Sequence, residues 1–82
     1  MPLYMDVHKV DAIDPEALAG AHERDLAVQD KHGVDYVRYW ISQDAGRVYC
    51  LVHAPDKEAA IAVHQEAHGM VADEIVEVVE GA

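Results

Sequence analysis

Two histidines stand four residues apart in the segment His64-Gln65-Glu66-Ala67-His68. If this segment is helical, both side chains lie on one face, one turn apart, and both imidazoles can reach the same metal ion. In the zinc-protease signature a glutamate directly follows the first histidine, but Gln65 occupies that place here. The pattern therefore excludes a zinc protease. The alternative is two surface histidines on an alanine-rich helix.

The chain contains further candidate metal ligands, because six of its 82 residues are histidines. Imidazoles supported by carboxylates suit zinc, nickel or copper. A carboxylate such as Asp25 or Glu66 could instead orient a ligand ring. The formal net charge of −10 concentrates cations around the protein. The candidate ligands are His8, His22, Asp25, His64 and His68, with His53 as a secondary candidate.

Local patterns predict the elements that must position these side chains. Apolar and polar residues alternate over residues 3–8, as in a half-buried strand. Asp14 can cap a helix that starts at Pro15 and is ended near residue 31 by Gly33. Two strands over 34–41 and 47–53, joined by a turn at 42–46, form a hairpin. A second helix over 55–68, closed by Gly69, precedes a strand over 74–80.

The predicted order β-α-β-β-α-β is that of a ferredoxin-like α+β fold with an antiparallel sheet, formed by a single domain over residues 1–82. In this topology the end of the first strand, the start of the first helix and the end of the second helix share one edge. We therefore expect His8, His22, His64 and His68 to gather there. His32 and His53 fall toward the opposite end. His32 suits the negative end of the first helix.

Strand alternation also predicts the two faces of the sheet. Residues expected to face the helices are Leu3, Met5, Val7, Val37, Tyr39, Ile41, Val48, Cys50 and Val52. Residues expected on the open face are Tyr4, Asp6, His8, Tyr36, Arg38, Trp40, Tyr49, Leu51 and His53. This open face is rich in aromatic residues, which favours a homodimer joined sheet to sheet, and Asp6 and Arg38 are candidates for an ion pair within it. A substrate pocket between the two sheets is the alternative.

Composition excludes several classes of protein. A surface this acidic repels nucleic acid. A single cysteine, Cys50, rules out a disulfide within the chain and a thiolate-rich metal site, and we expect it to serve as a small core residue. Neither a signal peptide nor a membrane-spanning apolar run is present, so we expect a cytoplasmic protein without membrane association.

Five segments of the chain carry a likeness to known proteins: Leu3–His8, Val37–Trp40, Cys50–Pro55, Val63–Gly69 and Ala72–Ile75. Together they resemble a family of small ferredoxin-like actinobacterial domains of unknown function, in which one characterised type is a homodimeric nickel-binding protein. The likeness covers essentially the whole chain. The resemblance implies Ni2+ held at the dimer surface, with a role in nickel sequestration or detoxification, and it does not assign the ligands.

These features leave three hypotheses for the function. The first is a nickel-binding protein without catalytic activity. The second is a small dimeric α/β-barrel enzyme, such as a monooxygenase or isomerase, with a site in a sheet cleft that uses His8, Arg38, Trp40 and His53. The chain shows neither a nucleophile–base pair nor a cofactor motif for this second reading. The third is a metal-responsive regulator, which could act only through a protein partner because the chain lacks a basic helix.

Overall fold

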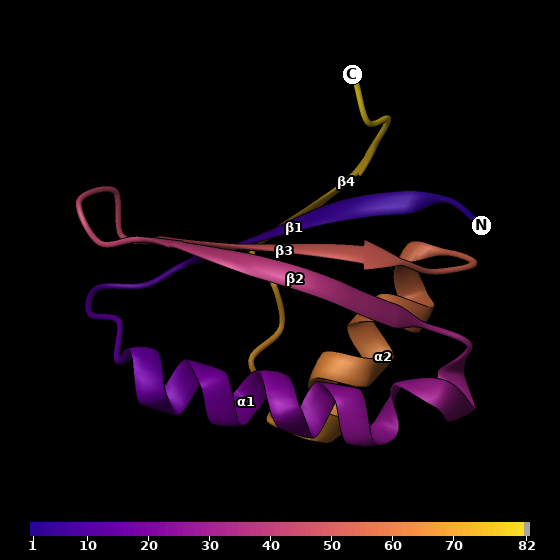
Figure 1. The fold of residues 1–82 in the computed structure, drawn as a ribbon, viewed down its shortest axis with the longest axis horizontal. Coiled ribbons are helices and arrows are strands. Elements are labelled where there is room, and N and C mark those ends of the chain that lie inside the picture. Colours follow the sequence, from indigo (N-terminus) through magenta and orange to yellow (C-terminus); the bar gives the residue numbers. More distant parts are fainter. Residues whose placement is uncertain (82) are drawn as a thin grey trace.

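The computed structural model describes residues 1–81 and confirms the predicted order of elements. Four strands form one antiparallel sheet in the order β2-β3-β1-β4, and both helices cover the same face of that sheet (Figure 1). This is the ferredoxin-like arrangement. The elements are β1 (Leu3–Lys9), α1 (Pro15–Val28), η1 (Gln29–His32), β2 (Asp35–Ser42), β3 (Arg47–His53), α2 (Lys57–Ala67) and β4 (Glu74–Val78).

Aspartate side chains cap the start of both helices, and Asp14 is the cap that the sequence predicts. The Asp14 side chain accepts a hydrogen bond from the backbone N–H of Glu16 at 3.0 Å, and Asp56 accepts one from Ala59 at 2.8 Å. The first helix is shorter than expected, because its α-helical part ends at Val28 and a 3₁₀ turn follows. Gly33 then reverses the chain with φ 67°, a left-handed conformation that glycine adopts without steric cost.

The face of β1 that packs against the helices is the opposite of the one that the alternation predicts. Tyr4 and Asp6 are buried beneath the helices, while Leu3, Met5 and Val7 belong to the open face. The partners across the ladder settle this assignment, since Tyr4 pairs with Val52 and Asp6 with Cys50, both buried. Asp6 can be buried because His64 on α2 contacts its carboxylate. Its apolar residues form part of the exposed side of the sheet.

A β-bulge in β2 explains a second departure. The register shifts between Tyr36 and Arg38, so the intervening Val37 has no direct partner on β3. Tyr36 consequently faces the helices, as Tyr39 and Ile41 beyond the bulge do, whereas Val37 is 39% exposed. The suggested ion pair between Asp6 and Arg38 is wrong, because Asp6 is buried under the helices and Arg38 is exposed.

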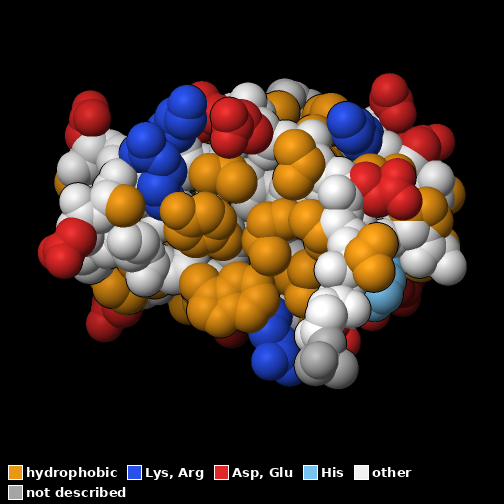
Figure 2. Space-filling model, turned by 90° about the horizontal axis from the view of Figure 1, so that it is seen from above, with side chains coloured by type: hydrophobic (Ala, Val, Ile, Leu, Met, Phe, Trp, Pro, Cys, Tyr) orange, Lys and Arg blue, Asp and Glu red, His pale blue; other side chains and the backbone are white. Residues whose placement is uncertain are grey.

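The open face of the sheet carries a broad apolar patch. Figure 2 shows hydrophobic side chains across its centre and charged side chains mainly around its rim. We call this surface the open face and define it by the strand residues that share it: Leu3, Met5, Val7, Arg38, Trp40, Tyr49, Leu51, His53, Val76 and Val78. Among residues 1–81, no helix has both the length and the apolar character to cross a membrane.

Candidate metal centre

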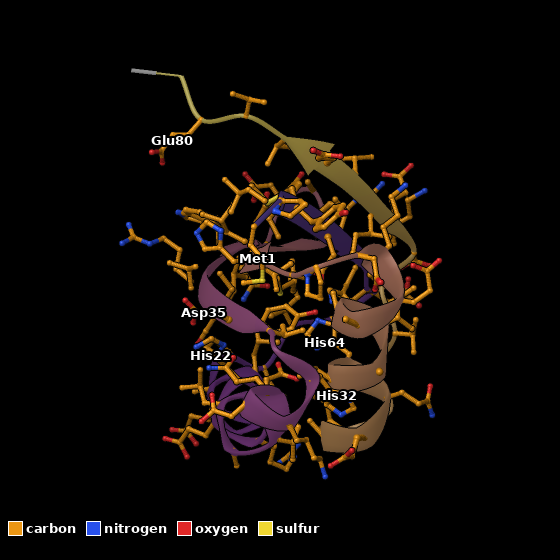
Figure 3. The ribbon with its side chains drawn as sticks, turned by 90° about the vertical axis from the view of Figure 1, so that its right-hand side faces the viewer. Met1, His22, His32, Asp35, His64 and Glu80 are labelled. Atoms are coloured by element: carbon orange, nitrogen blue, oxygen red, sulfur yellow. The ribbon has the colours of Figure 1, made fainter. Side chains whose placement is uncertain are left out.

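Among residues 1–81, three aspartate and histidine residues are almost fully buried between the sheet and the helices. Asp6 is 1% exposed, Asp25 is 3% exposed and His64 is 2% exposed. They come from β1, α1 and α2, and Figure 3 shows His64 in the interior between the sheet and the helices. Burying charged groups without partners is very costly, so their mutual contacts must compensate. The fold thus encloses a polar cluster in a small apolar core.

One half of the cluster is a triangle of nitrogen and oxygen atoms. Asp25 Oδ1 lies 2.9 Å from His64 Nδ1 and 3.0 Å from His68 Nε2, and these two nitrogens lie 3.1 Å apart. The helical i, i+4 spacing brings the two rings together, as the sequence predicts. The backbone N–H of Met70 donates to the other nitrogen of His68, Nδ1, at 3.0 Å. We call Asp25, His64 and His68 the triad.

The other half of the cluster lies toward β1. His64 Nε2 is 3.1 Å from Asp6 Oδ2, and His8 Nε2 is 3.2 Å from Asp6 Oδ1. The Tyr36 hydroxyl, 3.0 Å from Asp6 Oδ2, donates to that carboxylate, and it also lies 3.1 Å from the backbone oxygen of Ala60. The two histidine contacts are close but poorly directed, so Asp6 Oδ1 and His64 Nε2 have no well-aligned hydrogen bond within residues 1–81.

The cluster shifts the pKa values of its members in opposite directions. Burial acts to lower the pKa of His64, but hydrogen bonds and charge attraction from Asp25 and Asp6 outweigh it and raise that pKa to about 9. Burial lowers the pKa of His68, and His64 adds to this effect while Asp25 opposes it. Burial would raise the pKa of Asp6, yet His64 and His8 hold it well below its ordinary value. His64 is therefore an imidazolium near neutral pH, flanked by two carboxylates.

The triad has the dimensions of a metal-binding face. Metal–nitrogen and metal–oxygen bonds of about 2.1 Å at right angles separate neighbouring ligand atoms by about 3 Å. The three edges of the triad, 2.9, 3.0 and 3.1 Å, match that separation. The two distances to Asp25 Oδ1 also suit hydrogen bonds, so one arrangement can hold either protons or a cation. Two imidazoles and a carboxylate form a donor set suited to nickel, zinc or copper.

A second group of potential ligands is less suited to a metal. Asp6, His8, Cys50 and His64 also bring ligand atoms within 4.8 Å of one another. Thiolate is the form of cysteine that binds metals, but burial and the nearby Asp6 carboxylate raise the pKa of Cys50, which favours the thiol. Cys50 is buried, as the sequence predicts.

A pocket of about 380 Å³ opens onto the triad. Asp25, His64 and His68 all line it, so an ion can reach them from this side. Asp6 is not part of the lining and lies behind His64 as seen from the pocket. The triad therefore lies on the pocket side of the cluster together with His8, and Asp6 contacts His64 from the opposite side.

The structure brings four of the six candidate ligands together: His8, Asp25, His64 and His68. His22 lines the same pocket, but its ring packs against Tyr39 with centroids 5.0 Å apart, and it contributes to neither ligand group. His53 lies on the open face, away from the cluster. His32 pairs with Glu66 at 3.1 Å, which places Glu66 outside the cluster as well.

Asp6 and Tyr36 are members of the cluster that the sequence reasoning missed. The alternation of β1 carried the signal, because Tyr4, Asp6 and His8 share one face. If His8 joins the histidines of α2 beneath the sheet, Asp6 must lie beneath it too. The sequence analysis expected His8 to join the helix histidines and also placed it on the open face of the sheet. These two expectations are incompatible, because the helices cover the other face.

Comparisons with known proteins show the family of the chain. A family model described as the nickel-responsive protein SCO4226-like matches residues 4–78. The chain belongs to this family. The crystal structure of SCO4226 from Streptomyces coelicolor A3(2) superposes with a TM-score of 0.89 at 40% sequence identity, covering 98% of this chain and 99% of that chain. The resemblance to a nickel-related actinobacterial family is thus confirmed. No curated protein shows significant similarity to the chain.

Proposed function

We propose that this member of the SCO4226-like family binds Ni2+ reversibly at the triad and serves in nickel sequestration or detoxification, without catalysis. The observation that carries the proposal is the triangle of Asp25, His64 and His68 ligand atoms, about 3 Å on each side, in residues that line a pocket. The family description, nickel-responsive, supports the choice of metal. The donor set alone would serve copper or zinc as well.

The surrounding residues fit a site that exchanges protons for a cation. His64 and His68 must present unprotonated nitrogens to the ion, and Asp25 supplies a negative charge. Asp6 lies on the far side of His64, 3.1 Å from its Nε2, in the place that carboxylates commonly take behind metal-binding histidines. When His68 Nε2 binds a cation, its proton belongs on Nδ1, so the Met70 N–H must turn away.

Removing one ligand should abolish most of the nickel affinity. Loss of a residue behind a metal ligand typically weakens binding by about 10- to 100-fold, so His68→Gln should exceed about 100-fold because it removes a ligand itself. Isothermal titration with NiCl2 at pH 7.5 measures this. His32→Gln is the matched control, since His32 contacts Glu66 outside the cluster. Unchanged binding in His68→Gln, or no binding in the unmodified protein, would reject the triad.

The structure gives little support to the hypothesis of an enzyme. Its proposed residues do not meet in one cleft: His8 lines the pocket at the triad, whereas Arg38, Trp40 and His53 line a separate hollow of about 270 Å³ on the open face. We therefore retain a binding role without catalysis as the proposal. A regulatory role through a protein partner is compatible with nickel binding.

A second copy of the chain is the proposed occupant of the open face. Trp40 is 46% exposed and Val76 is 50% exposed, and both belong to the open face. The face is suited to self-association, because Arg38 and Glu80 supply opposite charges around the same hollow. A two-fold symmetric dimer places identical patches against each other and requires such self-complementarity.

Trp40→Lys should weaken this dimer strongly. Exposed tryptophans at the centre of interfaces often contribute about 2 kcal/mol or more, which corresponds to about a 30-fold increase in the dissociation constant. Analytical ultracentrifugation over a range of concentrations measures the shift. Leu26→Lys is the control, because Leu26 is 44% exposed but lies on α1. A monomeric unmodified protein, or equal effects of both substitutions, would contradict the proposed interface.

A further inference from the structure

The pocket above the triad is larger than a metal ion requires. Its volume is about 380 Å³, whereas one water molecule occupies about 30 Å³ of liquid. An ion with a few bound waters therefore fills only part of the space. Pockets of about 300–1,000 Å³ with mostly apolar walls and a few polar groups are typical of sites for small organic molecules.

The lining of the pocket combines polar and apolar residues, as sites for such molecules do. The triad supplies three polar ligand atoms, and His8, Lys9, His22 and Asp73 add further polar groups. Apolar side chains line the pocket from three sides: Leu18 from α1, Tyr39 and Val48 from the sheet, and Met70 and Val71 from the segment between α2 and β4. Water gains few hydrogen bonds against these walls, so an apolar group is favoured there.

The triad also leaves the metal incompletely coordinated. Three protein atoms occupy three positions, and nickel or copper with nitrogen and oxygen ligands takes at least four. An outside donor must therefore come from the pocket side. Free anions are disfavoured near Asp25 and Asp6 in a chain with net charge −10. A chelator that becomes attached through the cation avoids this repulsion, because the divalent charge offsets the two carboxylates.

We propose that the pocket binds nickel together with a small organic chelator, whose two donor atoms coordinate the ion at the triad and whose apolar body packs against Leu18, Tyr39 and Met70. This inference rests on the proposed function, since the ion joins the chelator to the protein. The physiological cargo is then a nickel complex of an amphipathic, singly charged chelator rather than the hydrated ion.

Two hydroxamates that differ only in their apolar body test the proposal. The nickel-loaded protein is titrated with acetohydroxamate and with benzohydroxamate, and the visible spectrum of nickel and the heat of binding are recorded. Burying a phenyl group should make benzohydroxamate bind at least about 10-fold more tightly than acetohydroxamate, after division by their affinity ratio for free Ni2+. Equal corrected affinities, extraction of the nickel by either compound, or equal binding without nickel would overturn the proposal.

Paired variants locate the apolar contact. Leu18→Asn should reduce the preference for benzohydroxamate by about 10-fold and leave the affinity for nickel alone unchanged, whereas Leu26→Asn on the same helix should change neither. Val71→Asn and its exposed control Val79→Asn repeat the comparison at positions that carry little of the core, since Val71 is 40% exposed and Val79 is 93% exposed.

These measurements separate the two proposals. If nickel alone does not bind the unmodified protein, the proposed function fails, and the proposed complex with a chelator fails with it. If nickel binds but the corrected preference for benzohydroxamate is absent, only the inference about the chelator is rejected. A preference that survives both Leu18→Asn and Val71→Asn would also reject it, because the apolar body would then lie elsewhere.

Discussion

Replacing His64 with alanine should lower the free energy of unfolding by about 3–5 kcal/mol, the usual cost of removing one partner from a buried charge pair. Without the imidazolium, Asp6 and Asp25 are left as carboxylates only 1% and 3% exposed. The loss is a large share of the total stability of a small domain, which is commonly about 5–15 kcal/mol. Urea unfolding followed by circular dichroism measures the change, and we expect a partly unfolded variant.

The control variants distinguish loss of charge balance from loss of packing. His22→Ala removes a ring that packs on Tyr39 without a carboxylate partner, so it should cost at most about 1 kcal/mol. Adding Asp6→Asn and Asp25→Asn to His64→Ala should restore part of the stability, because uncharged amides need no counter-charge. If the triple variant is no more stable than His64→Ala, the carboxylates are not the cause of the loss.

Nickel affinity should rise about 10-fold per pH unit between pH 7 and 9 and level off above pH 9. The pKa of His64 is about 9, so one proton must leave this ring before its nitrogen can bind the ion. The pKa of His68 is lowered, so its ring is already neutral in this range. Calorimetry at pH 7.5 in two buffers of different ionisation enthalpy should detect about one proton released per nickel. An affinity independent of pH would contradict this assignment.

The stability of the metal-free protein should change with pH in the opposite direction. The pKa of His64 is about 9 when folded and 6.5 in its ordinary state, so the folded protein holds this proton more tightly. The resulting stabilisation, on the order of 3 kcal/mol, is complete below about pH 6.5 and is lost as the pH rises through 9. Saturating nickel should remove much of this dependence, because the cation replaces the proton between the carboxylates.

The sequence by itself determined the order of the elements and part of the site. Caps at Asp14 and Asp56 and the reversal at Gly33 depend on local hydrogen bonds and backbone sterics, and these are encoded within a few neighbouring residues. The pairing of His64 with His68 is equally local, because one helical turn sets it. Connectivity of a ferredoxin-like fold was enough to bring His8 to the same end.

Only the tertiary structure decided which face of β1 is buried. Alternation identifies the two faces of a strand, and apolar side chains normally occupy the buried one. The apolar residues Leu3, Met5 and Val7 therefore led to a wrong prediction of the buried face. Asp6 is buried instead because His64 and Tyr36 compensate its charge across elements distant in sequence. The bulge at Val37 could not be predicted from local sequence either, because a bulge depends on how the strand pairs with its partner strand. Long-range contacts of this kind also bring Asp25 of α1 to His64 and His68, and the three side chains form the buried triad.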